Sequence, residues 1–398
     1  MPILSVIIPT HNRQRYAIDA ITSILQNFPD TEVVVTDTSD TREIEEKLSH
    51  WIQSGRLVYD HPSQALDVVR NFENGLALAT GDYLVFLGDD DCLGPDIERI
   101  ANWANLSGID AISSSLAASY FWPDFKSLYF GGEYTAKLTV QPYTAKATAL
   151  SGVDALREAL ENMGMGAMHM PRAYLGMISS ELAKRIKTKY GSLFGGVSPD
   201  IYSAALISVE AVNSILLDYP FIIAGSSGAS TSGQSAEGKH KGGLRSNSHI
   251  GAFRDLKWDP LIPEFYSVHT VWGFSLKKAS DILNKNEYSP NLLRLYAKCF
   301  LHHPAYWREI TESLLAYLIK RKSVNIFFVF PYELVRELVR RMKRYIQIKK
   351  NQVITEDCYS VGGVQSVSEA YKYLEKYVKD ASHKLDLSLI NNSAVTGR

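Results

Sequence analysis

The sequence predicts an α/β protein in which an open, mostly parallel sheet is flanked by helices and followed by a helical C-terminal part. Three observations predict this class. Over about the first hundred residues, short β-branched runs alternate with segments whose apolar residues recur every three or four positions. The connections between these segments are short, as in a sheet covered on both faces. From about residue 256 onward, the apolar spacing is helical to the end of the chain.

Each element of the first part has its own signal. The run ILSVII at Ile3–Ile8 is almost entirely apolar and is closed by Pro9, as expected of a strand buried on both faces. Apolar residues at Ala17, Ile21 and Phe28 then follow helical spacing. By the same reasoning, we expect helices at residues 17–28, 41–53 and 68–79, and further strands at residues 33–35, 57–59 and 83–87.

The later part of the chain is less regular. Ser151 is a suitable N-cap for a helix that runs to Asn162. Gly and Ser dominate residues 224–238, which favours a mobile loop reaching to about residue 250. We expect residues 1–255 to form one domain, with halves at about 1–110 and 111–255. Residues 256–398 would form a helical C-terminal domain with a disordered tail.

Composition narrows the functional class. The 398 residues carry 42 Lys and Arg against 43 Asp and Glu, so the formal net charge is −1 and no nucleic-acid partner is expected. Three widely spaced cysteines without a CxxC pair argue against a disulfide or zinc framework. We find no signal-peptide pattern and no apolar run of about 20 residues. The expected location is therefore cytoplasmic.

The densest chemical signal is the triplet Asp89-Asp90-Asp91, which follows a predicted strand. Adjacent carboxylates repel each other unless a cation lies among them, and Mg²⁺ or Mn²⁺ shared with substrate phosphates is the usual answer. The alternative is a solvated acidic turn that caps a helix beginning near Pro95. Polar residues at the ends of the first two strands would meet the triplet at one sheet edge, which favours the metal.

Other nucleotide-binding signatures are missing from the first strand–helix turn. A GxGxxG loop does not occur there, so a Rossmann-type dinucleotide site has little support. A GxxxxGK[ST] motif does not occur either, which excludes a P-loop. Asp37, at the end of the second strand, is placed to accept hydrogen bonds from a base or a ribose, although aspartates at such positions are often only turn residues.

Three segments of the sequence resemble family 2 glycosyltransferases with the GT-A fold. They are IIPTHNR, EVVVTD and the stretch from Arg70 to Asp91 (RNFENGLALATGDYLVFLGDDD). The resemblance covers about the first 100 residues clearly and extends weakly to about residue 250. It implies a nucleotide-sugar-binding half at about 1–110 and an acceptor half at about 111–255. It also implies an inverting enzyme that uses Mn²⁺ or Mg²⁺ to transfer a sugar from a nucleoside-diphosphate donor, usually a UDP-sugar, to a hydroxyl group.

The resemblance also implies roles for individual residues. Asp37 would contact the uracil or ribose, and Arg70 would lie near the base and phosphates. Asp89 would meet the ribose, and the metal ligands would be Asp90 and, because the triplet leaves the register open by one residue, Asp91. Three residues would lie against the nucleotide: Pro9, Thr10 and His11.

The catalytic base implied by the resemblance is Asp200, which lies in a segment leading into a helix that Pro199 starts. On the residues alone, complementing the helix dipole is the favoured role for Asp200, and only the resemblance reverses this. Related enzymes often order a flexible loop over the donor diphosphate, and here His240 and Lys241 would be its metal or phosphate contacts. A surface loop with scattered charge is the alternative.

A basic segment near the C-terminus could contact a membrane, although a helix packed on its own domain is the more common reason for such a pattern. Arg336–Lys350 holds seven Lys and Arg against one acid, Glu337, and follows the apolar run Ile326–Phe330. Such a helix suits an anionic membrane surface, although it could also pack on its own domain. Peripheral attachment to the inner membrane face would suit a lipid-linked saccharide acceptor in surface polysaccharide synthesis.

Two other functions stay open at this point. A non-catalytic binding or assembly partner would keep the fold without turnover. A nucleotidyltransferase would also need a metal, but it would be expected to open with a Gly-rich GxGTR-like turn in place of PTHNR.

Overall fold

The structure is a computed structural model that describes residues 2–128, 131–253, 256–321, 326–351, 358–381 and 384–389. Its centre is an eight-stranded sheet in the order β3-β2-β1-β4-β10-β6-β11-β9. The first four strands in this order are mutually parallel, whereas β10 runs antiparallel to both neighbours. The strands are β1 (Leu4–Thr10), β2 (Thr31–Asp37), β3 (Leu57–Asp60), β4 (Tyr83–Phe86), β6 (Ala111–Ser114), β9 (Ala147–Ala149), β10 (Gly176–Ser179) and β11 (Ser214–Leu217).

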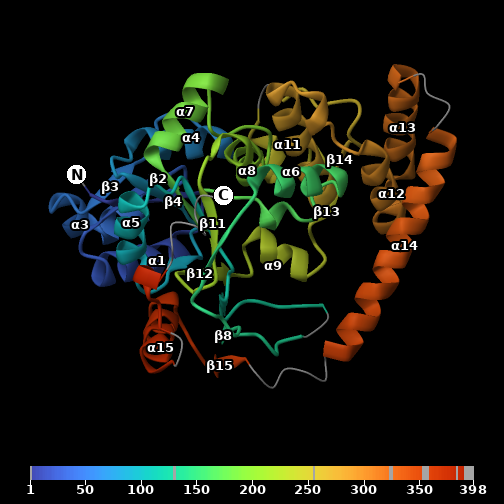
Figure 1. Cartoon of the computed structure of the whole chain (residues 1–398). Helices are drawn as coiled ribbons and strands as arrows, with labels where there is room; N and C mark the ends of the chain where they lie inside the picture. The colour runs from blue at the N-terminus through green and yellow to red at the C-terminus, as the bar shows by residue number, and fades with distance from the viewer. Residues whose placement is uncertain are drawn as a thin grey trace.

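Helices cover both faces of this sheet (Figure 1). Successive residues of β1 point to opposite faces, so Val6 and Ile8 join one apolar core and Ile7 joins the other. The predicted strands are confirmed, and so is the helix capped by Ser151; the helix expected at 41–53 is two short ones that meet at the buried Leu48. The helices are α1 (Gln14–Asn27), α2 (Glu43–Lys47), α3 (Ser49–Gln53), α4 (Val68–Leu78), α5 (Ile97–Leu106), α6 (Gly152–Glu161), α7 (Ser180–Tyr190) and α8 (Pro199–Glu210).

A second, five-stranded sheet has the order β15-β8-β7-β12-β5. It brings segments from three distant parts of the chain together, because β15 near the C-terminus pairs with β8 and β12 pairs with β5, which directly follows the acidic triplet. Its strands are β5 (Cys92–Leu93), β7 (Ala118–Phe121), β8 (Lys137–Val140), β12 (Ile222–Ser226) and β15 (Tyr359–Gly362).

The prediction of a mobile loop at residues 224–250 is wrong. The segment contains the end of β12, α9 (Thr231–Ala236), β13 (Lys241–Gly243) and α10 (Ser248–Gly251). The small residues serve close packing: a Cβ on Gly225 would lie 1.8 Å from the carbonyl oxygen of Asp90, and a Cβ on Gly233 would lie 2.0 Å from that of Ser227. The Ser230 hydroxyl also caps α9 by accepting from the Gly233 amide.

The expectation of helices alone after residue 256 is wrong at two strands, β14 (Phe265–Ser267) and β15. Between them lie α11 (Val268–Leu283), α12 (Leu292–His302), α13 (Trp307–Arg321) and α14 (Ile326–Asn351). Of these, α11 lies beside α8, whereas α12, α13 and α14 project to the right-hand side of the molecule (Figure 1). The chain then returns through α15 (Val367–Asp380), where the Val367 amide and the Ser368 hydroxyl both donate to the Asp19 carboxylate of α1 at 2.7 Å. Most of the predicted tail lies outside the described residues.

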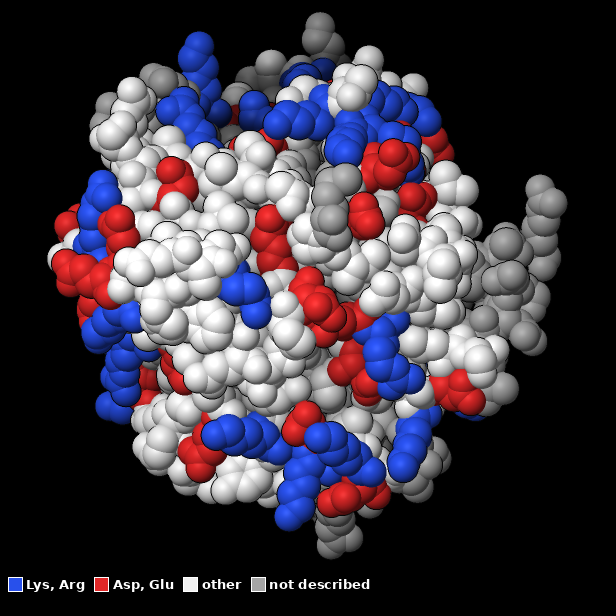
Figure 2. Space-filling view, turned by 90° about the vertical axis from the view of Figure 1, so that its left-hand side faces the viewer, with Lys and Arg blue, Asp and Glu red and all other residues white. Residues whose placement is uncertain are grey.

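Charges of both signs are interspersed over the face beside β3 and α3 (Figure 2), as the near-zero net charge implies. None of the helices within the described residues combines the length and the apolar character that crossing a bilayer requires.

Candidate active site

The carboxyl ends of β1 and β2 are fastened together at one edge of the main sheet. Asn12 and Asp40 exchange two hydrogen bonds of 2.9 Å, and the amide of Thr38 donates to the Thr10 carbonyl at 3.1 Å. Asn12 has a φ of 53°, a left-handed conformation that asparagine tolerates better than most residues. This turn sets the direction of Arg13, which begins the approach to α1.

Arg13 holds the first two carboxylates of the acidic triplet. Its guanidinium lies 2.7 Å from an Asp89 oxygen and 3.0 Å from an Asp90 oxygen, and both carboxylate side chains are only 5% exposed. The Thr10 hydroxyl donates to the other Asp89 oxygen at 2.8 Å. Burial raises the pKa of Asp89 to about 6 even though the Arg13 charge opposes the rise. A cation therefore does lie among the carboxylates, and it is an arginine of this chain.

Asp91 is held by a different set of partners. One oxygen accepts from the Gly225 amide at 2.6 Å, and the other accepts from the Gly88 amide at 2.8 Å and the Tyr174 hydroxyl at 3.0 Å. Burial, together with the charge of Asp90, raises the pKa of Asp91 to about 8. These contacts join the end of β4 to β12 and to the segment before β10, and they give no support to the prediction that Asp91 binds a metal.

The residue after β12, Ser227, also contacts the acidic triplet and Arg13. The amide of Ser227 donates to an Asp90 oxygen at 2.9 Å, and the Ser227 hydroxyl accepts from Arg13 at 2.7 Å. The Trp122 indole donates to the Asp90 carbonyl at 3.0 Å. Asp90 is therefore held by residues that follow β1, β7 and β12, and these residues lie 77, 32 and 137 positions from it in the chain.

Asp200 lies in the first turn of α8, with Pro199 at the start of that helix, as predicted. The Ser198 hydroxyl donates to the Asp200 carboxylate at 2.7 Å. Burial raises the pKa of the Tyr174 phenol, and the charges of Asp91, Asp90 and Asp200 reinforce this rise. The Tyr174 phenol donates to Asp91 and is also within electrostatic range of Asp200.

A buried arginine, Arg172, lies on the Asp200 side of this site. The residue is 4% exposed, and its Nε atom has no hydrogen-bond partner among the described residues. Burial lowers the pKa of its guanidinium, while the charges of Asp200 and Tyr174 act in the opposite direction. A buried guanidinium with an unmet donor suits an anionic or hydroxyl-rich ligand, because the unmet donor otherwise costs free energy.

The chemistry of Asp89 and Asp90 fits a hard divalent cation. Both present carboxylate oxygens at a strand end, and they already hold a positive group between them. Within the described parts of the chain, no group of three or more His, Cys, Asp or Glu side chains forms a metal cage. Mg²⁺ or Mn²⁺ here would take its remaining ligands from substrate phosphates and water, as is usual for such ions.

The residues predicted to bind the nucleotide lie at the carboxyl edge of the main sheet, and they differ in exposure and in hydrogen-bond partners. Pro9 and Thr10 end β1, and the exposed His11 ring bonds the Thr38 carbonyl at 2.8 Å. Asp37 is fully buried, and its oxygens accept from the Ser39 amide and the Tyr59 hydroxyl. The turn-residue interpretation thus describes its contacts.

Arg70 borders a cavity of about 330 Å³ that also reaches Gly196, in the segment before Asp200. The guanidinium of Arg70 is largely exposed and lies 3.5 Å from the Asp67 carboxylate that caps α4. The other basic side chains that line this cavity are Lys257 and Lys278. The cavity therefore presents cations beside Gly196, which lies four positions before Asp200.

His240 and Lys241 are placed elsewhere by the structure. His240 bonds Ser235 at 2.7 Å and stacks on Tyr266, and Lys241 pairs with Ser267 in the β13–β14 ladder. Both contribute to lowering the pKa of His303 in the helical part.

Sequence reasoning did not single out Arg13, Arg172, Tyr174 or Ser227. Arg13 was visible in the PTHNR segment, but a cation three residues after the end of β1 gives no sign of which carboxylates it will reach. The other three lie outside the well-matched first hundred residues, and only tertiary structure brings them to the triplet.

An open α/β sheet with clustered carboxylates and an arginine at its carboxyl edge defines a class of proteins that bind ligands at strand ends. Residues 5–125 match the family model described as glycosyl transferase family 2. The N-terminal part of the chain therefore belongs to this family, and the predictions of the family and of its α/β fold class are confirmed.

Two curated relatives share this part of the chain. The abequosyltransferase RfbV of Salmonella typhimurium is 33% identical over 99 residues, which is 24% of this chain and 30% of the relative. The GalNAc(5)-diNAcBac-PP-undecaprenol β-1,3-glucosyltransferase of Campylobacter jejuni is 38% identical over 96 residues, 23% of this chain and 30% of the relative. The chain thus spans less than a third of the length of either relative.

Two solved structures match over most of the chain. S. aureus TarS 1-349 in complex with UDP-GlcNAc has a TM-score of 0.44 at 14% identity, covering 94% of this chain and 91% of that one. The mannosyltransferase PcManGT from Pyrobaculum calidifontis, in complex with GDP-Man and Mn²⁺, has a TM-score of 0.42 at 14% identity, covering 95% and 88%. TM-scores below 0.5 are too low to carry an argument about substrate, metal or mechanism.

Proposed function

We propose that this protein is an inverting, metal-dependent glycosyltransferase that moves a sugar from a nucleoside-diphosphate donor to a hydroxyl of a saccharide. The observation that carries the proposal is the cluster of buried carboxylates Asp89, Asp90 and Asp91 around Arg13 and Tyr174, at the carboxyl edge of a sheet whose residues match the family 2 model. Asp200 lies within electrostatic range of the Tyr174 phenol. This arrangement supplies a carboxylate for the acceptor and a cation-holding cluster for the donor.

Asp89 and Asp90 would hold Mg²⁺ or Mn²⁺, and Asp91 would keep the cluster in place. When bound, the ion would act as a Lewis acid that neutralises the charge developing on the leaving diphosphate. Arg13 already contacts both carboxylates, so it competes with the ion or turns toward the phosphates when the ion binds. Either arrangement leaves a positive group next to the donor.

Asp200 would act as the general base. Its carboxylate would take the proton from the acceptor hydroxyl while the acceptor oxygen bonds to the anomeric carbon and the bond to the leaving phosphate oxygen breaks. One displacement inverts the anomeric centre and needs no covalent intermediate. We assign Arg172 to the substrate beside Asp200, because substrate oxygens would satisfy its unpartnered Nε atom.

We propose UDP as the nucleotide, held against Pro9, Thr10 and His11, with Arg70 beside the phosphates. The position of these residues along one sheet edge supports this placement. A role for Asp37 toward the ribose would require it to share oxygens that now bind Ser39 and Tyr59. We keep no role in donor binding for His240 and Lys241, whose recorded contacts lie in the β13–β14 region.

For the acceptor, we propose a lipid-linked saccharide used in surface polysaccharide synthesis, met at the cytoplasmic membrane face. The printed name of the Campylobacter jejuni relative describes an undecaprenol-linked substrate, which supports this class. The match covers only a minor part of that relative, so this chain's own reaction must identify the acceptor.

The test is UDP release from a panel of UDP-sugars with Mn²⁺ or Mg²⁺, measured with and without extracts of lipid-linked saccharides. We expect release that depends on the metal and falls at least about 100-fold in Asp90→Asn and Asp200→Asn. A second candidate, a non-catalytic binding partner, is favoured by the closed Arg13–Asp89–Asp90 contact. UDP binding without release under every condition would establish that candidate and refute the enzyme.

A further inference from the structure

The outer side of α14 exposes an unusual number of large apolar side chains. Phe328 is 77% exposed, Tyr332 is 62% exposed and Met342 is 60% exposed. An exposed apolar stripe of this length marks an interaction surface, because a solvated helix would carry polar groups there. We define the α14 outer face by its exposed members: Phe327, Phe328, Tyr332, Val335, Leu338, Val339, Met342, Tyr345 and Ile346.

The spacing of these residues puts them on one side of the helix. Six of them follow alternating intervals of four and three positions, which keeps side chains in a single stripe. Pro331 lies within the helix and does not interrupt the stripe. The six are Phe328, Tyr332, Val335, Val339, Met342 and Ile346.

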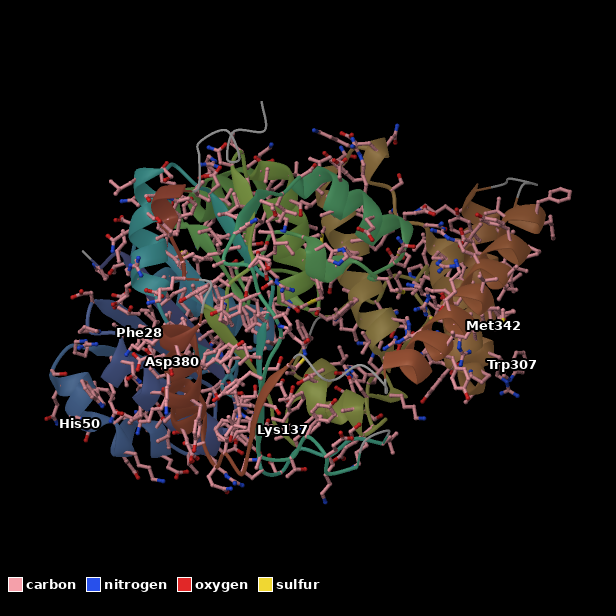
Figure 3. The ribbon with its side chains drawn as sticks, turned by 60° about the horizontal axis from the view of Figure 1, so that its bottom comes forward. Phe28, His50, Lys137, Trp307, Met342 and Asp380 are labelled. Atoms are coloured by element: carbon pink, nitrogen blue, oxygen red, sulfur yellow. The ribbon has the colours of Figure 1, made fainter. Side chains whose placement is uncertain are left out.

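The opposite side of α14 is occupied by this chain. Glu333 and Glu337 are buried there, and both form ion pairs with Arg294 of α12, at 3.2 and 2.9 Å. Arg340 also pairs with Glu337. Because these contacts fix which side faces the body, the outer face points away from it, and Figure 3 shows Met342 and the exposed Trp307 of α13 at the outer limit of the molecule.

Charge decides which partner fits. Glu333 and Glu337 are the only acidic residues of α14, and both are used on the inner side. Exposed basic residues lie on either side of the outer face, Arg341 on one side and Lys343 on the other. A second copy docked on this stripe would bring like charges together without an acidic partner from α14, which disfavours a homodimer.

We infer that the α14 outer face binds an anionic lipid surface, with its apolar side chains inserted at the headgroup boundary and its basic side chains on the phosphates. An apolar stripe with basic flanks is the pattern of helices that lie in the plane of a bilayer. This attachment needs no catalysis, so it holds whether or not the proposed sugar transfer is correct. It would place the protein on the surface that carries lipid-linked acceptors.

The test is co-sedimentation of the full chain with vesicles of phosphatidylcholine alone or with one-third phosphatidylglycerol. We expect binding only to the anionic vesicles, weakening as NaCl rises because salt screens the attraction. In R341Q/K343Q, affinity should fall about fivefold per charge, or about 25-fold in total. In V335Q/M342Q, whose sites are 59% and 60% exposed, affinity should fall at least tenfold without unfolding.

Two matched variants control for charge and for apolar surface elsewhere. K372Q/K376Q removes two exposed charges of α15, and L106Q/V212Q changes side chains that are 89% and 81% exposed. Both should bind vesicles like the unchanged protein. Equal binding by all four variants would overturn the inference. A soluble dimer that V335Q/M342Q dissociates, together with no vesicle binding, would overturn it in favour of a second copy.

Discussion

Replacing Arg13 with Gln should destabilise the protein and make its stability depend on a divalent ion. Arg13 is the positive group between Asp89 and Asp90, at 2.7 and 3.0 Å, and both carboxylate side chains are 5% exposed. Removing one partner of a buried ion pair typically costs about 3–5 kcal/mol, because the remaining charges are left without compensation. We expect the loss to lie in the lower half of this range, because Arg13 itself is 22% exposed.

The assay is thermal unfolding in EDTA and then in 5 mM Mn²⁺ or Mg²⁺. At about 2 °C per kcal/mol, a loss of about 3 kcal/mol lowers Tm by roughly 6 °C in EDTA. The ion should restore more of the Tm in the variant than it adds to the unchanged protein, since a ligand of the native state stabilises it by mass action. Arg15→Gln is the control, because Arg15 is exposed and should change stability by less than about 0.5 kcal/mol.

Two results would refute this reasoning. If Arg13→Gln unfolds at the same temperature as the unchanged protein in EDTA, the ion pairs do not contribute as the geometry indicates. If Mn²⁺ and Mg²⁺ leave the variant unchanged, Asp89 and Asp90 do not hold a divalent ion even when Arg13 is gone.

Three other perturbations test separate parts of the structure. Gly225→Ala should destabilise the folded protein by roughly 3 kcal/mol in chemical unfolding, because the added Cβ would lie 1.8 Å from the Asp90 carbonyl oxygen. Gly242→Ala should be neutral, because a Cβ there would have nothing within 4 Å. Equal effects of the two substitutions would contradict the packing argument. Asp200→Asn should slow sugar transfer about 100- to 10,000-fold, while calorimetry shows unchanged UDP binding. The control Glu181→Gln, at an exposed site, should keep full activity. A parallel loss of donor affinity in Asp200→Asn would contradict its role as the general base. Burial lowers the pKa of His303 to about 4, so between pH 6.5 and 4 the unfolded chain binds a proton that the folded chain does not. Stability therefore falls as pH falls through that range, by less than about 1.4 kcal/mol per pH unit because the ring is partly exposed. His303→Gln should flatten this slope in urea unfolding, and an unchanged slope would exclude the assignment.

The parallel half of the main sheet was predictable because its signals are local. Each strand from β1 to β4 is a short apolar run with a polar end, and the connections are short enough to leave few alternatives. Pro199 likewise announces the start of α8 and so puts Asp200 in its first turn. These features depend on a few neighbouring residues, and a sequence contains that information directly.

The errors have a common physical cause. The Gly and Ser of residues 224–238 indicated flexibility, yet Gly225 and Gly233 are small because another backbone passes beside them. Composition cannot tell a glycine required by close packing from one in a mobile loop. In the same way, nothing local to PTHNR reveals that Arg13 will reach Asp89 and Asp90, which are 76 and 77 positions later in the chain.

Because the chain returns to Asp19 after α14, the projecting helices α12, α13 and α14 form an insertion. The segments before and after this insertion both pack on the domain that contains the main sheet. Val367 and Ser368 fasten the far end, and β14 and α11 leave from the near end. An appendage held at two points resists swivelling more than one on a single tether. If α14 rests on a bilayer, the catalytic edge would therefore keep a fixed height and tilt above the lipid headgroups, which would limit how far along a membrane-anchored glycan the enzyme can reach.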